Sequence, residues 1–329
     1  MPTIAVAALT CRRPELLSRL LASLENLATP DGCEVFILVV DNAPDMPVRE
    51  LAESWGRRSG RRLVYALEPE PGIPLARNRA LDEAAGLGAD LLAFVDDDEF
   101  VEPEWLSRLV AHQGETGAVL VGGPVRAVAA EGELSWLGRR VYGGIHAGYL
   151  RKERKNARRR ARGADGKVTI ITNNWLGDLA WLGDHALRFD PELRYSGGED
   201  TALYAAAKRL GAKTSWCPDA IVFETVPHER ISLGYQFRRA RDQASTSMLR
   251  KRREDRRSFV SSLGAIAGKL IVGGALFIAA PFTGGRTLVD GARSFGWGVG
   301  YAYALAGRRS RHYQSLPAEV PGRPKLGPG

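Results

Sequence analysis

The chain is poor in cysteine and lacks several signatures that would settle its class at once. Its 329 residues include three cysteines, Cys11, Cys33 and Cys217, too few and too scattered for a disulfide framework or a zinc cluster. The first apolar run, 4–9, is too short for a signal peptide, and positive charge follows it instead of preceding it. We therefore expect reduced thiols and a chain that starts in the cytoplasm.

Nucleic-acid-binding signatures are also absent, since no segment resembles a homeodomain, a zinc finger or an RNA-recognition motif. The net charge is nevertheless +8, and two stretches account for it. Residues 151–162 hold eight Lys or Arg against one acid, and residues 238–257 hold nine against three. Because the basicity is local, it predicts two surfaces for anions and no nucleic-acid partner.

The first hundred residues alternate between strand and helix patterns. The predicted buried strands are 4–9, 35–40, 63–66 and 91–95, and the predicted helices are 13–24, 48–55 and 73–85. Strands that are apolar throughout and alternate with helices predict a parallel sheet covered on both faces. Thr10, Asp41 and Asp96 follow strand ends, at the sheet edge where ligands bind in such folds. No GxGxxG turn follows the first strand, which disfavours an ordinary dinucleotide fold.

The middle of the chain is less regular. Residues 119–128 and 168–172 are predicted as strands, and 151–166 as a basic loop or frayed helix. Residues 201–210 are predicted as a helix that Gly211 closes.

Four adjacent acids, Asp96 to Glu99, leave the last of the buried strands. Such a cluster is costly unless a cation neutralises it, and Mg²⁺ bridging to phosphate oxygens is a natural partner. The alternative is a solvated acidic turn that caps the next helix.

A second acidic pair, Glu199-Asp200, follows Gly197-Gly198 at the start of a predicted helix. Asp200 could serve only as a helix cap, but the double glycine also lets the backbone approach a ligand closely. Arg77 lies early in another helix beside the predicted ligand edge, whereas Arg79 is interpreted as a solvated charge.

Taken together, these segments resemble a known family. The segments are Thr10, Val39-Val40-Asp41-Asn42, Ala76-Arg77-Asn78, Phe94 to Glu99 and Gly198-Glu199-Asp200. In this order and at these separations they resemble a family 2 glycosyltransferase of the GT-A fold. Residues 224–230 and 237–239 further resemble bacterial exopolysaccharide enzymes of the succinoglycan biosynthesis type, and the resemblance covers about residues 3–245.

The resemblance implies roles for individual residues. It assigns the nucleotide-sugar side of the site to Thr10, Asp41, Arg77, Asp96 and Asp97. Asp98, with Asp96, would hold Mn²⁺ or Mg²⁺. His228 would add a ligand, or is a surface histidine. Asp200 would be the catalytic base, with Glu199 beside it, in a single displacement that inverts the anomeric centre. Trp175 and Trp181 either line the acceptor sugar or pack in the core.

The C-terminal region has a different composition. Residues 263–282 form an apolar stretch that as a helix is about 30 Å long, and residues 295–306 form a second. The pairs Gly264/Gly268 and Gly296/Gly300 suit close helix packing, and basic residues flank both runs. We expect helices in the membrane interface, with a spanning hairpin as the second choice and buried helices as the alternative.

The sequence therefore predicts an α/β GT-A domain with a Rossmann-like, mostly parallel sheet over residues 1–230. A membrane-associating region at 231–316 and a disordered tail at 317–329 would follow. The expected activity moves a hexose from a nucleoside-diphosphate sugar, with UDP favoured, to a polyprenyl-pyrophosphate-linked or oligosaccharide acceptor. It would act at an anionic membrane, peripheral or monotopic on the cytoplasmic face of the inner membrane. The rivals are a sugar nucleotidyltransferase and a non-catalytic membrane scaffold of the same fold.

Overall fold

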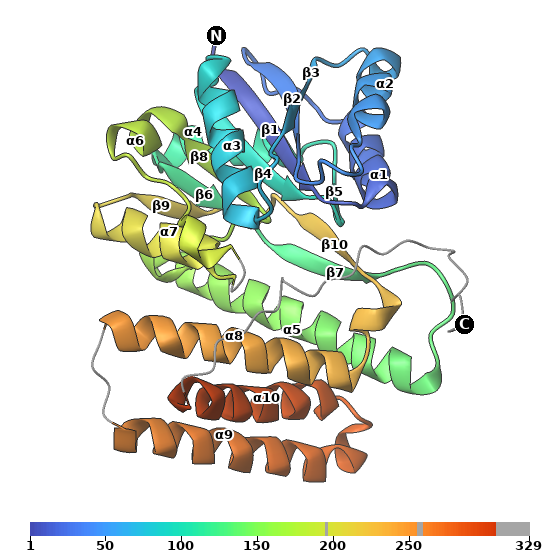
Figure 1. The fold of residues 1–329 in the computed structure, drawn as a ribbon, viewed down its shortest axis with the longest axis vertical. Coiled ribbons are helices and arrows are strands. Elements are labelled where there is room, and N and C mark those ends of the chain that lie inside the picture. The colour runs from blue at the N-terminus through green and yellow to red at the C-terminus, as the bar shows by residue number, and fades with distance from the viewer. Residues whose placement is uncertain (195–196, 255–258, 307–329) are drawn as a thin grey trace.

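A mostly parallel, seven-stranded sheet forms the centre of the N-terminal part of the chain (Figure 1). The computed structural model describes residues 1–194, 197–254 and 259–306. In order across the sheet, the strands are β3 (Leu63–Leu67), β2 (Glu34–Asp41), β1 (Thr3–Thr10), β4 (Leu91–Asp96), β8 (Trp175–Asp178), β6 (Leu120–Gly122) and β9 (Thr214–Trp216). β8 runs antiparallel to both neighbours, and the other pairs are parallel. The expected Rossmann-like sheet is confirmed.

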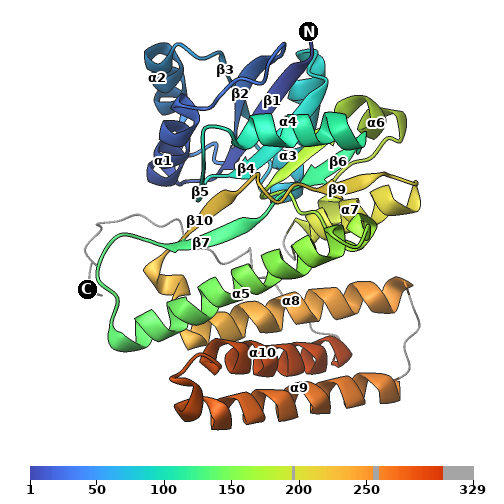
Figure 2. The same ribbon diagram turned by 180° about the vertical axis from the view of Figure 1, so that it is seen from behind.

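Helices cover both faces of this sheet, as the apolar strands require. One face packs against α1 (Pro14–Glu25), α2 (Arg49–Ser59) and α4 (Trp105–Thr116), and the other against α3 (Ile73–Gly86), α6 (Leu179–Asp184) and α7 (Glu199–Arg209). α3 lies in front of the sheet in Figure 1, and α4 lies in front of it in the reverse view of Figure 2. Each face therefore has its own apolar core.

A second, three-stranded sheet begins where β4 ends. It consists of β5 (Glu99–Val101), β10 (Val222–Val226) and β7 (Val125–Ala129), with β10 in the middle. Asp97 and Asp98 form the turn between β4 and β5. The acidic segment is thus fixed at the junction of the two sheets.

Four long helices form a layer beneath the sheets: α5 (Trp136–Arg160), α8 (Leu233–Glu254), α9 (Phe259–Ala279) and α10 (Leu288–Leu305) (Figures 1 and 2). Gly296 and Gly300 bring α10 against α8, since a Cβ at Gly300 would lie 2.2 Å from the Arg241 carbonyl oxygen. The expected close packing of this glycine pair is confirmed. An added Cβ at Gly264 or Gly268 would meet nothing within 4 Å. Among the described residues, no helix has both the length and the apolar character needed to cross a bilayer.

Two expectations for the middle of the chain were wrong. The run 119–128 is two strands in two sheets, because the chain turns at Gly123-Pro124, where an added Cβ would lie 2.2 Å from the Ala220 carbonyl oxygen. Residues 168–172 bury alternate side chains but pair with no strand in the described part of the chain. For the basic run, the helical alternative is confirmed, since α5 extends from its Ser135 cap to Arg160. The predicted tail, 317–329, lies outside the described residues.

Candidate active site

The ends of β1, β2 and β4 meet at one edge of the main sheet. Thr10 pairs with Asp41 in the register of β1 and β2, and Leu9 pairs with Asp96 in that of β1 and β4. The predicted clustering of Thr10, Asp41 and Asp96 at the carboxyl edge is therefore confirmed.

Asp41 is fully buried at this edge, and both of its carboxylate oxygens have partners. Oδ1 accepts from the Ala43 N–H at 3.0 Å, and Oδ2 accepts from the Val48 N–H at 2.9 Å and the Tyr65 hydroxyl at 2.8 Å. These bonds order the loop after β2 and raise the pKa of Tyr65, for which burial is the larger cause. A contact of Asp41 with a nucleobase stays a prediction.

Asp97 connects β1 to the acidic turn. Its Oδ2 accepts from the Thr10 hydroxyl at 3.0 Å, and its Oδ1 accepts from the Arg13 guanidinium at 3.1 Å. Desolvation raises the pKa of Asp97 to about 6, with Arg13 opposing the rise and Asp98 adding to it. Arg13, which the sequence interpretation passed over, therefore holds the acidic turn against β1.

Arg77 on α3 joins the two acidic segments. Its guanidinium donates to the Glu199 carboxylate at the start of α7, and it lies 3.7 Å from Asp96 Oδ1. Arg77 and Glu199 are both buried, whereas 37% of the Asp96 side chain is exposed. Arg77 thus brings segments 96–98 and 199–200 together at one site, which we call the acidic cleft.

The Asp96 side chain is partly exposed at this site. Desolvation raises the pKa of Asp96 to about 7, with Arg77 opposing the rise and Asp98 adding to it. The Asp96 N–H donates to Glu99 Oε2 at 2.8 Å, and burial raises the pKa of Glu99 well above its usual value. The cleft therefore holds more negative charge than its arginines balance, which is the environment that a divalent cation relieves.

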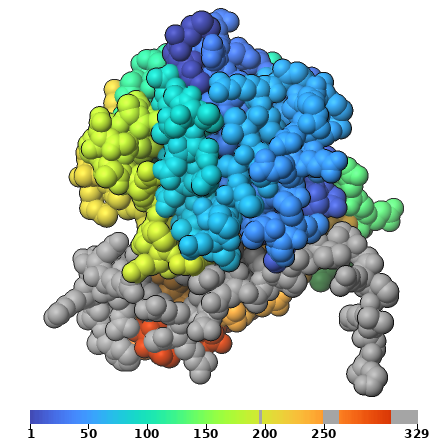
Figure 3. All heavy atoms as spheres, turned by 45° about the horizontal axis from the view of Figure 1, so that its top comes forward, coloured from blue at the N-terminus to red at the C-terminus, as the bar shows by residue number. Residues whose placement is uncertain are grey.

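Two asparagine side chains connect segments around the site that lie far apart in the sequence. The Asn42 side chain donates to the carbonyl groups of Glu68 and Glu70 and accepts from the Gly72 N–H at 2.8 Å. Asn78 exchanges two hydrogen bonds with the Phe189 backbone, at 2.8 and 2.9 Å. In the space-filling view, α3 in cyan and the yellow-green segment around α6 lie against each other (Figure 3).

Asp200 lies in the first turn of α7, next to Glu199. Gly197 and Gly198 have φ values of 71° and 88°, a left-handed backbone that glycine adopts without strain, and close approach of a ligand to them stays a prediction. The helix cap is Gly198, and Asp200 Oδ1 accepts from the Thr201 N–H and hydroxyl. Asp200 Oδ2 has no hydrogen bond within the described residues, which leaves it available to a substrate hydroxyl.

Asp98 is held by an arginine from a distant segment. Arg230, in the short helix η3 (His228–Arg230), donates to Asp98 Oδ2 at 3.1 Å and lies 3.8 Å from Glu224 Oε1. The Tyr149 hydroxyl of α5 donates to Glu224 Oε2 at 2.6 Å. Burial raises the pKa of Glu224, with the Asp98 charge as the second cause. These contacts link distant segments, so sequence spacing gave no signal for them.

The residues present fit a divalent cation in part. Asp96 and Asp98 lie two residues apart on the turn after β4, and each keeps a carboxylate oxygen without a hydrogen bond in the described part of the chain. His228 is exposed and lies against Gly132, and no described contact joins it to these carboxylates. No group of three or more His, Cys, Asp or Glu arranged as metal ligands occurs in residues 1–194, 197–254 and 259–306. A metal role for Asp96, Asp98 and His228 stays a prediction.

The two tryptophans differ in their surroundings. Trp175 is buried and packs on Phe94 with ring centroids 5.3 Å apart, so it belongs to the core and does not line the acceptor site. Trp181 is partly exposed and stacks on His185.

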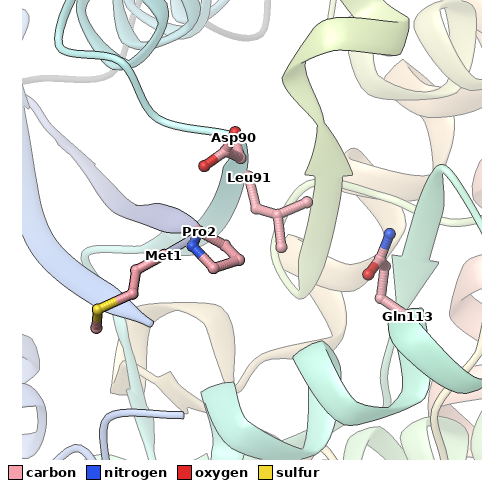
Figure 4. Close-up of a pocket in the computed structure, with 5 residues that line it drawn as sticks. All are labelled: Met1, Pro2, Asp90, Leu91 and Gln113. Carbon is pink, nitrogen blue, oxygen red and sulfur yellow. The ribbon is translucent and has the colours of Figure 1, made fainter. Parts of the chain in front are cut away.

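A shallow pocket lies at the opposite edge of the sheet (Figure 4). Met1, Pro2, Asp90, Leu91 and Gln113 line it. Its one carboxylate, Asp90, already accepts from the Thr3 N–H at 2.8 Å. This pocket lies at the start of β1 and β4, away from the acidic cleft at their other end.

Comparison with known proteins identifies the family of this chain. Residues 5–181 match the family model described as glycosyl transferase family 2. The succinoglycan biosynthesis protein ExoM of Rhizobium meliloti is 32% identical over 236 residues, 72% of this chain and 71% of that protein. Glycosyltransferase AglE of Haloferax volcanii is 32% identical over 89 residues, 27% of this chain and 28% of that protein.

Solved structures show the same fold. Residues 1–349 of S. aureus TarS, alone and in complex with UDP, give TM-scores of 0.51 and 0.50 at 15% and 16% identity. Each comparison covers 94% of this chain and 92% of the TarS chain. The α/β architecture is therefore that of GT-A-like glycosyltransferases. On the family match and the identity to ExoM, this chain belongs to glycosyl transferase family 2 and is a glycosyltransferase.

Proposed function

We propose that this enzyme transfers a hexose from a UDP-sugar to a lipid-linked or oligosaccharide acceptor in exopolysaccharide biosynthesis, with inversion at the anomeric carbon. The observation that supports this most is the ion-pair bridge of Arg77 between Asp96 and Glu199, because it brings the donor edge and the α7 carboxylates into one cleft. The relationship to ExoM supports the pathway, and the complex of TarS with UDP supports the donor.

The donor side is the edge formed by β1, β2 and β4. Thr10, Asp41 and Arg77 would contact the nucleotide, while Asp96 and Asp98 would hold Mn²⁺ or Mg²⁺ beside its diphosphate. A bound divalent cation supplies charge stabilisation for the departing diphosphate. The raised pKa of Asp96 supports this assignment, because desolvation and the nearby charges of Asp98 and Asp97 all disfavour its ionised form, and a divalent cation would offset them.

The acceptor side is the start of α7. Asp200 would accept the proton of the attacking hydroxyl through Oδ2, while its Oδ1 stays bonded to Thr201. Glu199 cannot easily share this task, because it is buried and paired with Arg77. One base and one charge sink are sufficient for a single inverting displacement.

Location at an anionic membrane surface is part of the same proposal. The helix α9 and the following turn expose large apolar side chains to solvent: Leu263, Ile271, Val272, Ile278 and Phe282. An exposed apolar face of this kind, with basic sequence on either side, is typical of helices that lie in the bilayer interface. We propose peripheral or monotopic attachment at the cytoplasmic face.

A nucleotidyltransferase is disfavoured because both arginines that follow β1 already form ion pairs within the protein. Such an enzyme would use basic residues there to bind a triphosphate, but Arg12 is paired with Asp45 and Arg13 with Asp97. A non-catalytic scaffold is disfavoured because Asp200 keeps a free oxygen in the cleft.

The decisive experiment is a donor panel. Purified protein is incubated with individual nucleotide sugars and Mn²⁺ or Mg²⁺, and the release of nucleoside diphosphate is measured. We expect release from a UDP-hexose, loss on chelation, and loss of about 10²–10⁴-fold in Asp200→Asn. Asp184→Asn changes an exposed acid at the end of α6 and should be unaffected. Full turnover in Asp200→Asn and Asp98→Ala would refute these roles, and pyrophosphate release from UTP and a sugar phosphate would establish the nucleotidyltransferase.

A further inference from the structure

Glu224 lies on β10 next to the acidic turn, where a further carboxylate is costly. It pairs with Glu99 in the register of β10 and β5, and the N–H of the next residue, Thr225, donates to the Asp98 carbonyl oxygen at 2.8 Å. The Glu224 side chain is buried, so desolvation and the like charge of Asp98 both disfavour its ionised form. The partners of Glu224 must offset this cost, and they therefore indicate its role.

The two carboxylate oxygens of Glu224 contact two different segments. Oε2 accepts from the Tyr149 hydroxyl of α5 at 2.6 Å, and Oε1 lies 3.8 Å from Nη1 of Arg230. The same nitrogen of Arg230 donates to Asp98 Oδ2 at 3.1 Å. These contacts connect α5 to the acidic turn through four side chains, which we call the Asp98 network: Tyr149, Glu224, Arg230 and Asp98.

Arg230 acts on one oxygen of Asp98. Its guanidinium donates to Oδ2, and Arg13 lies 4.0 Å from the same oxygen. Oδ1 of Asp98 has no hydrogen bond within the described residues. Since the Thr225 N–H fixes the backbone of Asp98 as well, the carboxylate can rotate only if these contacts break. Arg230 therefore helps to determine which oxygen of Asp98 is available to a ligand.

Two further side chains restrict Arg230 itself. Glu224 gives the same guanidinium nitrogen a second anion, so this nitrogen is held by two carboxylates. Tyr149 fixes the Glu224 side chain, because a hydrogen bond has a direction, whereas the charge of Arg239, which also stabilises ionised Glu224, has none. The exposed fractions of the Arg230 and Asp98 side chains are 22% and 12%, so water screens their contact only weakly. The position of Arg230 thus depends on both Glu224 and Tyr149.

Building on the proposed function, we propose that Tyr149 and Glu224 are positioning residues for the donor site. They hold Arg230 against Oδ2 of Asp98, so that Oδ1 stays available to the divalent cation that accompanies the donor diphosphate. Neither residue needs to touch the donor, since each acts through Arg230. Partners of this kind, which orient a metal ligand without binding the metal, commonly change metal affinity when they are removed.

A purely structural role is the competing explanation, and α5 offers a matched comparison. The helix runs beneath β7 and β10 (Figure 2). Tyr142, two turns before Tyr149, donates its hydroxyl to the Ala127 carbonyl oxygen on β7 at 3.0 Å. Tyr142→Phe and Tyr149→Phe therefore each remove one hydrogen bond between α5 and the three-stranded sheet, without changing the net charge. Only Tyr149→Phe disturbs the Asp98 network.

The experiment compares the UDP affinity of the wild type and both variants by titration calorimetry, with Mn²⁺ and with EDTA. We expect Mn²⁺ to raise the UDP affinity of the wild type and of Tyr142→Phe equally. In Tyr149→Phe, the UDP affinity with Mn²⁺ should be lower by about tenfold or more, and the affinity with EDTA unchanged. Thermal midpoints of the two metal-free variants should fall by similar small amounts. If Tyr149 acts through Arg230, adding Tyr149→Phe to Arg230→Gln should change the UDP affinity with Mn²⁺ by less than about twofold.

Equal UDP affinity in all three proteins with Mn²⁺ would overturn the positioning role and leave the proposed function intact. An equal loss in Tyr142→Phe and Tyr149→Phe would overturn it too, because attachment of α5 would then be responsible. A full additional loss in the double variant would exclude Arg230 as the route and so contradict the positioning role. Wild-type protein whose UDP affinity Mn²⁺ does not raise would instead refute the metal assignment in the proposed function, and the positioning role with it.

Discussion

Arg77 on α3 and Glu199 on α7 form a buried ion pair between residues 122 positions apart in the sequence. Removing one partner of a buried pair leaves an uncompensated charge, so we expect Arg77→Met to lower the free energy of unfolding by about 3–5 kcal/mol. Because burial already raises the pKa of Glu199, the loss should shrink as the pH falls and Glu199 becomes neutral. Urea denaturation at two pH values measures both effects.

The double variant Arg77→Met with Glu199→Gln is the control for this prediction. It removes both charges, so its loss of stability should be smaller than that of Arg77→Met alone. A double variant that is less stable than Arg77→Met would show that the pair does not act as described.

The free energy of unfolding should fall as the pH rises, because two carboxyl groups of the site have raised pKa values. Asp96 and Asp97 have folded-state pKa values of about 7 and about 6, above the unfolded value of 3.8. The folded state therefore binds more protons than the unfolded state between about pH 4 and 7, and stability contributed by these groups falls as the pH rises through this window. Thermal midpoints of the metal-free protein measure this fall.

Asp96→Asn removes one of the two titrating groups and should flatten the profile. Stabilisation by Mn²⁺ with UDP should grow over the same pH range, because the cation competes with protons for the carboxylates. A wild-type profile that is flat between pH 5 and 8 would contradict the raised pKa values.

The glycines of the helical layer provide a matched pair of substitutions. Gly300→Ala should destabilise the protein by about 1–3 kcal/mol, because its Cβ would collide with the α8 backbone at Arg241. Gly264→Ala on α9 meets nothing within 4 Å, and it should stabilise the helix by about 0.5–1 kcal/mol. Urea denaturation of both variants measures the difference in sign, and effects of the same sign would contradict the packing of α10 on α8.

Membrane attachment should depend on the exposed face of α9. Ile271 and Ile278 are 71% and 74% exposed, and burying such a side chain in a bilayer contributes about 1.5–3 kcal/mol. We expect Ile271→Asp and Ile278→Asp each to weaken binding to phosphatidylglycerol vesicles about tenfold or more, as measured by flotation. Leu210→Asp, at an exposed site after α7, should have no effect. Unchanged flotation in both isoleucine variants would exclude α9 as the contact.

The edge of the main sheet could be predicted from sequence because its signals are local. Thr10, Asp41 and Asp96 each end an apolar run, and parallel strands bring such ends together. Arg230 and Tyr149 could not be found in this way, because they reach Asp98 and Glu224 through tertiary packing. The alternation at residues 168–172 predicted a strand, but the segment is irregular and only buries alternate side chains in the core.

The basic run of α5 shows a second limit of sequence interpretation. As a block, residues 151–162 predict one surface that binds anions, but the helix directs successive residues to different neighbours. Arg151 pairs with Asp290 on α10, while Arg160 donates to the Trp216 carbonyl group on β9. Lys152 is the residue of this run whose charge acts on Asp200 and Glu224.

Arg230 has a further consequence because of where it lies in the chain. Its guanidinium donates to Asp98 Oδ2, and α8 begins three residues later at Leu233. The Gln236 side chain also donates to the Arg230 carbonyl oxygen at 2.8 Å, which fastens the short connection to the helix. A tilt of α8 would therefore be transmitted through Arg230 to the Asp98 carboxylate. If α9 docks on a bilayer as proposed, the orientation of the helical layer and the position of Asp98 would be mechanically connected.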